Sequence, residues 1–371
     1  MSQETHETTK MPERPGGSGL GVPIGVVPGC QFASDNTAGV CPEALAAFIA
    51  ANEGSQASYG NDRYTPAVAE RLRELFAADC DVYFVFNGTA ANSLAVSTCC
   101  QPYHSVICSE VAHLETDECG GPEFFSGGAK LLLAHSREGK LDPASVEELV
   151  TRRSDIHYPK PHVLSITQST ELGTVYSLEE LATLSAVARR LHLKIHMDGA
   201  RFANAVASLG VAPGEIVKAA QVDVLCLGGA KLGLPIGEAV LFFDRRLSAD
   251  FAYRCKQAGQ LGSKMRFLTA PWLGLLSDDA WLRHARHGNA MAARLSRGLQ
   301  AIPGVELLHP TDANAVFAHL PAAVHAALAA RGWRYYTFIG QGSARFMCSW
   351  ATSEAEVDAL LADIRSERQV Q

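Results

Sequence analysis

The sequence predicts an α/β protein built on a large, mostly parallel sheet. Between residues 66 and 245, short apolar segments alternate with segments of helical periodicity, as in parallel strands joined by crossover helices. The chain has 371 residues, of which 47% are hydrophobic and 19% charged. This composition suits a folded protein with a large core and about two domains.

The alternation can be followed in order along the chain. Helical spacing predicts helices over 67–78, 89–100, 142–153 and 177–191. Short apolar segments predict strands over 81–86, 104–109, 162–167, 193–198, 222–228 and 238–243. A mostly parallel sheet needs helices on both of its faces, so these helices are expected to cover it.

The character of the sequence changes after Asp244. Long helices are expected over 246–258 and 271–301, and short apolar segments then alternate with helices near 322–331 and from 353 onward. This pattern predicts a smaller α+β domain on a long connecting helix. We therefore expect a flexible N-terminal tail (1–28), a large α/β domain (29–245) and a small C-terminal α+β domain (246–371).

The bulk chemistry argues against several classes of function. The net charge is −7 and there is no basic run, which argues against nucleic acids and anionic membranes as partners. No apolar run approaches the roughly 20 residues of a membrane-spanning helix, and the N-terminus lacks the apolar core of a secretory signal. The 10 cysteines form no C-x-x-C pair or zinc-type spacing. We therefore expect reduced thiols, a cytoplasmic protein and no metal site.

Polar residues at the carboxyl ends of the predicted strands suggest a site. Gly88 and Thr89 open a helix, where free N–H groups and the helix dipole suit a phosphate, although a plain turn is the alternative. Asp198 ends an apolar strand, where a carboxylate needs a partner. Arg201, the ring nitrogen of a bound cofactor and a helix N-terminus are the three candidates.

Lys231 lies in the glycine-rich turn "GGAKLG", directly after an apolar strand. A partly desolvated lysine amine can form a Schiff base, whereas an ordinary surface lysine is the alternative. Lys231, the acid Asp198 and the anion seat at Gly88 together fit pyridoxal 5′-phosphate. That cofactor needs a lysine, an acid at its pyridine nitrogen and a phosphate site.

These residues belong to a longer series of motifs between about residues 31 and 360, namely "SDNTAG", "YGND", "NGTAAN", "AHLETDE", "HMDGAR", "GGAK" and "ARF". In order and spacing the series resembles the low-specificity L-threonine aldolases, which are fold-type-I, aspartate-aminotransferase-like enzymes. The resemblance implies a seven-stranded type of sheet and retro-aldol cleavage of L-threonine, L-allo-threonine and related amino acids such as phenylserine to glycine and an aldehyde. Another reaction on this scaffold, such as β-elimination, racemisation or transamination, stays open.

The resemblance also implies roles at the cofactor. Lys231 matches the Schiff-base lysine and Asp198 the partner of the pyridinium nitrogen. His113 matches the histidine that stacks on the ring, and Arg201 would contact the side of the ring hydroxyl. The base that accepts the proton of the substrate β-hydroxyl is left open between His113, Glu171 and an ordered water.

At the cofactor phosphate, the resemblance implies a cradle formed by Gly88 and Thr89. One departure from the family pattern lies here. The residue before the lysine is usually Ser or Thr, but this chain has Ala230. A hydroxyl donor to the phosphate is therefore missing, and another donor is expected to replace it.

For the substrate, the resemblance implies that Ser34 and Arg345 bind the α-carboxylate of an amino acid. Arginine suits this task because its planar guanidinium meets a carboxylate with two parallel hydrogen bonds. A second departure is Glu171, which stands where some members carry a histidine near the substrate hydroxyl.

The resemblance also implies a pocket shared between subunits. Asp35 and the segment 59–62, which begins with Tyr59, belong near the site and help to complete a neighbouring subunit's pocket. Lys256 and Arg266 fall where basic residues of that subunit approach the phosphate. A homodimer is therefore the expected minimum, and a homotetramer the expected assembly.

Overall fold

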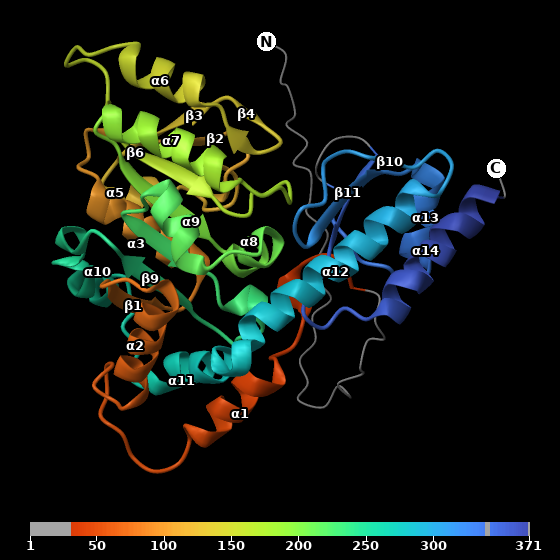
Figure 1. The fold of residues 1–371 in the computed structure, drawn as a ribbon, viewed down its shortest axis with the longest axis horizontal. Helices are drawn as coiled ribbons and strands as arrows, with labels where there is room; N and C mark the ends of the chain where they lie inside the picture. Colours follow the sequence, from red (N-terminus) through yellow and green to blue (C-terminus); the bar gives the residue numbers. More distant parts are fainter. Residues whose placement is uncertain (1–30, 338–341, 370–371) are drawn as a thin grey trace, which may run out of the picture.

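The computed structural model describes residues 31–337 and 342–369 of the chain (Figure 1). The tail expected over residues 1–28 lies outside this range. Two sheets dominate the described part, a larger one of seven strands and a smaller one of three. None of the helices in the described ranges is both long and apolar enough to cross a membrane.

The larger sheet has the strand order β1-β9-β8-β7-β6-β2-β3. Its strands are β1 (Asp81–Val85), β2 (His104–Ser109), β3 (Lys130–Ala134), β6 (Lys160–Thr167), β7 (Lys194–Gly199), β8 (Val224–Leu227) and β9 (Glu238–Phe242). Strand β9 is antiparallel to both of its neighbours, β1 and β8, whereas the other pairs are parallel. The strand β9 therefore begins at the edge of the sheet where the other strands end.

Helices cover both faces of this sheet. One face carries α3 (Gly88–Cys99) and α10 (Phe251–Gln257). The other carries α2 (Tyr64–Phe76), α6 (Pro143–Thr151), α7 (Leu178–Arg190), α8 (Phe202–Leu209), α9 (Pro213–Ala220) and α11 (Arg266–Leu275). The strands in the middle of the sheet are mostly apolar because both of their faces are buried.

Side chains along β7 alternate between the two faces of the sheet, and this alternation decides which face each residue points to. Ile195 and Met197 join the core under the six-helix face, so the residues between and after them point toward α3. One of these is Asp198. The other is His196, and both of its ring nitrogens already have hydrogen-bond partners. They lie 2.9 Å from Ser165 Oγ and 3.4 Å from the sulfur of a neighbouring cysteine. Burial lowers the pKa of His196 to about 4.

The smaller sheet is antiparallel and has the order β10 (Glu306–Leu307), β11 (Ala315–His319) and β12 (Ser343–Met347). It packs with α12 (Ala280–Gln300), α13 (Ala322–Ala330) and α14 (Glu354–Gln369) over a core of its own. Figure 1 shows α12 running from beside α11 to the smaller sheet. The exact division of the chain at residue 245 stays a prediction.

The structure differs from the sequence prediction in several elements. The helix expected over 271–301 is two helices, α11 and α12, because Asp278 and Asp279 have φ of 47° and 53°, in the left-handed region. Strand β3 was not predicted. The other α-helices and strands that were not predicted are α1 (Pro42–Ala50), α4 (His113–Thr116), α5 (Gly121–Ser126), α8, α9, β4 (Ser136–Arg137) and β5 (Lys140–Leu141).

Candidate active site

The carboxyl ends of β1, β7 and β8 and the start of β9 surround a cavity of about 300 Å³. Sites in α/β proteins form at this edge because the loops that follow parallel strands converge there. Polar and charged side chains and one glycine line the cavity, among them Gly88, Thr89, Asn92, His113, Asp198, Lys231 and Glu238.

Asp198 is a buried carboxylate that is held at both oxygens. Its Oδ2 accepts a hydrogen bond from Asn92 Nδ2 at 2.9 Å, and its Oδ1 accepts one from the backbone N–H of Ala200 at 3.0 Å. Burial opposes ionisation. The charge of His113, the Ala200 N–H and Lys231 outweigh it and hold the pKa of Asp198 below its usual value. The carboxylate is therefore ionised at neutral pH.

His113 begins α4 and is tied to a second buried acid. Its Nδ1 lies 2.8 Å from Oε1 of Glu118, and Asn92 Nδ2 donates to the same oxygen at 2.9 Å. The Asn92 amide thus joins Asp198 and Glu118. The hydrogen bond to Glu118 raises the pKa of His113, and the charge of Asp198 adds to this effect against burial. A raised pKa favours the protonated form of His113, which makes it a weaker candidate for a base.

The start of α3 forms an open donor site at the same cavity. Asn87 is the N-cap, and its side chain accepts from the backbone N–H of Ala90 at 2.9 Å. The N–H groups of Gly88 and Thr89 precede the first N–H bonded within the helix, so they are free for a ligand. A Cβ added to Gly88 would meet nothing within 4 Å. This helix end suits an anion in the cavity.

Lys231 lies in a 3-10 turn, Ala230–Leu232, directly after β8. A buried carboxyl group supports this turn, because Oε2 of Glu238 accepts the N–H of Gly229 at 2.5 Å. Burial raises the pKa of Glu238 to about 7, although the N–H groups of Gly229 and Ala230 and the charge of Lys231 oppose the shift. Glu238 is therefore partly protonated near neutral pH, beside the lysine and the anion site.

We expect Glu238→Gln to change how stability depends on pH in protein freed of small ligands. A folded-state pKa of about 7, above the ordinary 4.5, gives stability that is complete below pH 4.5 and is lost as pH rises toward 7. The loss is about 3 kcal/mol for a shift of this size. The glutamine variant has no proton to lose in this range. The difference between its free energy of unfolding and that of the wild type should therefore rise, in favour of the variant, by about 3 kcal/mol between pH 4.5 and pH 7.5.

Urea unfolding at a series of pH values measures this difference. Glu148→Gln on α6 is the matched control, because Glu148 is exposed, and its curve should run parallel to that of the wild type. A parallel curve for Glu238→Gln as well would show that the carboxyl group of Glu238 titrates normally.

A second group of charges lies next to the cavity. Arg201 is buried and makes two hydrogen bonds to Asp35, Nε to Oδ2 at 2.8 Å and Nη2 to Oδ1 at 3.1 Å. Asn314 Nδ2 also donates to Asp35 Oδ2, at 3.1 Å. The other acidic neighbour is Glu171, whose Oε2 lies 3.7 Å from Arg201 Nη1. Burial disfavours the charged guanidinium, but Asp35 and Glu171 reverse the effect and raise the pKa of Arg201.

Arg345 approaches this group from β12 of the smaller sheet. Its Nη2 donates to the backbone oxygen of Ala33 at 3.3 Å, and its guanidinium lies 4.9 Å from the ring centre of Tyr336. Ala33 directly precedes Ser34, which caps the short helix that carries Asp35. Burial lowers the pKa of Arg345, and the charge of Arg201 adds to this effect. Two arginines thus face one region between the sheets, which suits a carboxylate ligand.

Comparison with known proteins agrees with this geometry. The model of the family described as beta-eliminating lyase matches residues 31–323. The chain belongs to the beta-eliminating lyase family. The match covers the whole of the larger sheet and continues through β10 and β11.

Two relatives of high identity carry the same name. The chain is 60% identical over 336 residues to a low specificity L-threonine aldolase of Pseudomonas sp. (strain NCIMB 10558), covering 91% of this chain and 97% of that protein. It is 58% identical over 335 residues to a low specificity L-threonine aldolase of Pseudomonas aeruginosa, covering 90% and 97%.

A solved structure of a threonine aldolase from Leishmania major has a TM-score of 0.85 at 30% identity, over 90% of this chain and 98% of that one. These similarities confirm the resemblance inferred from the motifs, the predicted fold class and the expectation of a lyase.

The structure brings most of the predicted site residues of this lyase together. Gly88, Thr89, His113, Asp198 and Lys231 line one cavity. Glu171, Arg201 and Arg345 belong to the adjacent charged group, and Ser34 precedes Asp35 of that group. The roles assigned to these residues by resemblance stay predictions.

Three predicted residues lie elsewhere. Lys256 Nζ lies 4.9 Å from the ring centre of Tyr59, and Arg266 Nη1 donates to the backbone oxygen of Gly54 at 3.0 Å. None of the three is among the residues that line the cavity of this chain. This position is compatible with a role in a neighbouring subunit, which stays a prediction.

One option considered for Asp198 is wrong. Arg201 was a candidate ion-pair partner of that carboxylate, but its ion pairs in the described residues are with Asp35 and Glu171. The side-chain partner of Asp198 is instead the neutral amide of Asn92. A second option, the helix N-terminus, is not observed either, because the next helix, α8, has Arg201 as its N-cap. The ring nitrogen of a cofactor is the candidate that remains, since Asp198 lines the cavity.

The sequence analysis missed Asn92, Glu118 and Glu238, although the first two lie in motifs that it quoted and Glu238 begins a strand that it predicted. Asn92 stands four residues after Gly88 on α3, so helical spacing places both on one face. Glu238 was missed because the direction of β9 was not predicted. In a parallel strand it would lie at the opposite edge of the sheet.

Proposed function

We propose that this protein cleaves L-threonine, L-allo-threonine and related L-β-hydroxy-α-amino acids such as phenylserine to glycine and an aldehyde, reversibly and with pyridoxal 5′-phosphate. One observation carries the proposal: Lys231, the ionised Asp198 and the open start of α3 face a single cavity. The names of the relatives at 60% and 58% identity support the same substrate class.

The residues fit the cofactor chemically. The cavity offers a lysine amine, a buried carboxylate and a helix start with open space at Gly88. Asn92 Oδ1 is buried and has no hydrogen-bond partner in the described part of the chain, which leaves an acceptor for a ligand. When bound, pyridoxal phosphate supplies an electron sink that stabilises negative charge at Cα of the amino acid.

At the cofactor, Lys231 would hold the aldehyde carbon covalently and exchange it for the substrate amine. Asp198 would keep the pyridine nitrogen protonated, and its lowered pKa suits that task. The phosphate would lie at the N–H groups of Gly88 and Thr89. Glu238, which is partly protonated near neutral pH, is the candidate to replace the hydroxyl donor that Ala230 lacks.

At the substrate, Arg345 and Ser34 would hold the α-carboxylate, which restricts the orientation of the bonds at Cα. Cleavage then requires a group that takes the proton of the β-hydroxyl. Glu171 and an ordered water are better candidates than His113, because the hydrogen bond to Glu118 favours the protonated form of that histidine.

The test is to supply the protein, with its cofactor bound, with L-threonine, L-allo-threonine and phenylserine, and to measure glycine and aldehyde in equal amounts. Pyruvate and ammonia from serine, without aldehyde from any of the three, would indicate β-elimination instead. The aldolase proposal would be rejected if the protein, with its cofactor bound, cleaved none of the three substrates.

We further propose a cytoplasmic homo-oligomer, a dimer at minimum and a tetramer by resemblance. The nine described cysteines are free and eight of them are buried, which supports a reducing compartment. Lys256 is exposed and lies away from the cavity of its own chain, as expected of a residue that approaches a neighbouring subunit's phosphate.

A further inference from the structure

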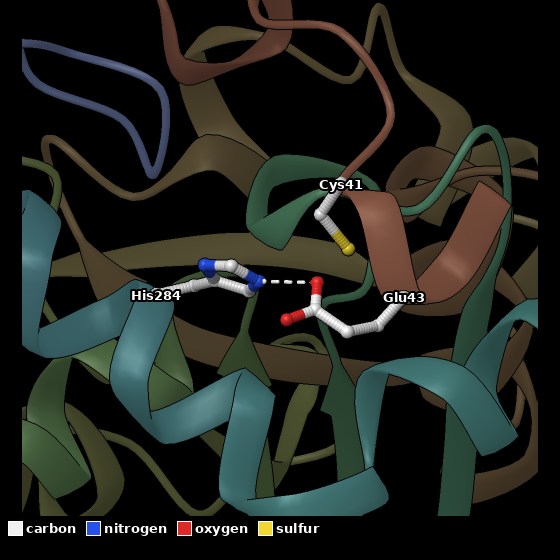
Figure 2. A group of neighbouring side chains, drawn as sticks. All are labelled: Cys41, Glu43 and His284. Atoms are coloured by element: carbon white, nitrogen blue, oxygen red, sulfur yellow. Dashed lines mark hydrogen bonds and ion pairs between the residues drawn. The ribbon is translucent and has the colours of Figure 1, made fainter. Parts of the chain in front are cut away.

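Outside the cofactor cavity, three metal-ligating side chains converge between α1 and α12. Cys41 is the N-cap of α1, Glu43 lies in its first turn, and His284 lies near the start of α12. One ligand atom from each, a sulfur, a carboxylate oxygen and a ring nitrogen, lies within 4.8 Å of the other two. Figure 2 shows the thiol and the imidazole directed at the carboxylate from different elements.

The packing around the three side chains fixes their directions. His284 Nε2 lies 3.0 Å from Glu43 Oε2, and the imidazole packs against the Trp350 ring at a centroid distance of 5.5 Å. Cys41 is fully buried, whereas Glu43 and His284 keep 29% and 15% of their side-chain surface exposed. The thiol therefore lies inside the protein, whereas the carboxylate and the imidazole reach solvent, which would supply a water ligand.

These distances suit a tetrahedral ion. Zn²⁺ binds sulfur at about 2.3 Å and nitrogen or oxygen at about 2.0–2.2 Å, so neighbouring ligand atoms lie roughly 3.3–3.8 Å apart. The three atoms lie within 4.8 Å of one another, so side-chain rotation around a bound ion would have to bring them to this spacing. Thiolate and imidazole favour Zn²⁺ over Mg²⁺ or Ca²⁺, which prefer oxygen ligands. Arg283 Nη2 donates to the other carboxylate oxygen of Glu43, Oε1, at 3.1 Å, so Oε2 is the oxygen that would bind the ion. An ion there would replace the hydrogen bond between Oε2 and His284 Nε2.

The location links the group to the lysine of the cavity. The backbone N–H of Cys41 donates to the oxygen of Gly233 at 2.8 Å, and Gly233 ends the turn that carries Lys231. Gly233 has a φ of 119°, and a Cβ there would lie 3.1 Å from Cys41 Sγ. An ion at the group would therefore fasten α1 to α12 directly behind the Lys231 turn.

We propose that Cys41, Glu43 and His284 form a Zn²⁺ site, with water as the fourth ligand, that ties α1 to α12 behind the catalytic lysine. The sequence analysis predicted no metal because Glu43 and His284 are 241 residues apart and show no ligand spacing. The site is separate from the cofactor cavity, since none of the three residues lines it. It does not depend on the reaction proposed above.

The test uses the full chain with its cofactor, stripped of metal by a chelator. We expect one equivalent of Zn²⁺ per chain, a rise in Tm with Zn²⁺ concentration, and with Co²⁺ a thiolate-to-metal charge-transfer band and tetrahedral visible bands. Cys41→Ser should remove the charge-transfer band. Cys41→Ser and His284→Gln should each weaken Zn²⁺ binding by more than the roughly 10–100-fold that loss of an outer-shell partner costs.

Two controls separate this site from adventitious binding. Cys119→Ser removes a cysteine that is exposed, and His309→Gln removes a histidine paired with Glu138 at 2.7 Å without a thiol. Both variants should bind Zn²⁺ as the wild type does. The proposal is overturned if the metal-free wild type takes up no stoichiometric Zn²⁺, or if His284→Gln, a change in a partly exposed side chain, binds it unchanged.

Discussion

The variant Lys231→Ala is expected to lose aldehyde formation from L-threonine by on the order of 10⁴-fold or more in kcat/KM, the scale of removing a covalent nucleophile. Lys231 projects from the turn between β8 and β9 into the cavity that also holds Asp198. Other residues there can bind pyridoxal phosphate, but among those that line the cavity Lys231 is the one with an amine to bond it.

Reduction with borohydride gives this prediction a second readout. Wild-type protein treated in this way should carry the cofactor on the peptide that contains Lys231, as seen by mass spectrometry. Lys218→Ala is the matched control, because Lys218 is an exposed lysine on α9. That variant should keep wild-type activity and labelling. Labelling of another lysine in the wild type, or a fully active Lys231→Ala, would contradict the assignment of Lys231.

The sheet was predictable because its signal is local. Strands such as β8 are buried on both faces, so Leu225 and Leu227 face one core and Val224 and Cys226 the other. A short, continuous apolar run is the result, and it can be recognised in the sequence without knowing its neighbours. The six strands predicted in the larger sheet are all present for this reason.

The elements that were missed lack that local signal. Strand β3 is at the edge of the sheet, with Lys130 exposed and Leu133 44% exposed, so its pattern is not that of a buried strand. The break between α11 and α12 depends on left-handed backbone at Asp278 and Asp279. Helical periodicity continues across that break, because both helices bury an apolar face.

In the candidate site, too, the residues with a local signal could be predicted from the sequence, whereas the contacts between distant residues could not. Lys231, Asp198 and Gly88 were found because each follows a predicted strand, and the ends of parallel strands meet at one edge. The pairings between side chains were not predictable, since Asn92 and Asp198 are 106 residues apart and Arg201 and Asp35 are 166 apart. Such pairs depend on how α3 and the first described turn pack on the sheet, which no local pattern reports.

Asp198→Asn is the second change for which we expect a large loss, on the order of 10³-fold or more in kcat/KM for L-threonine. Asparagine keeps the shape but removes the charge that would hold the pyridine nitrogen protonated. It also places an NH₂ group against a donor, because the two oxygens of Asp198 accept from Asn92 and from the N–H of Ala200. We therefore expect the variant to retain bound cofactor with an altered absorbance spectrum, and to unfold more easily at neutral pH.

The pH dependence of stability separates charge from packing in this variant. The pKa of Asp198 is lowered by folding, so its carboxylate stabilises the protein above the ordinary value of 3.8, and this contribution is lost as pH falls below it. The stability gap between wild type and Asp198→Asn should accordingly narrow in acid. Asp223→Asn is the matched control: Asp223 is also buried and precedes β8 at the opposite edge of the sheet, paired with Arg189 at 2.8 Å. Asp223→Asn should lower stability while kcat stays near the wild-type value. If Asp198→Asn preserved kcat equally well, Asp198 would not be the residue that keeps the pyridine nitrogen protonated.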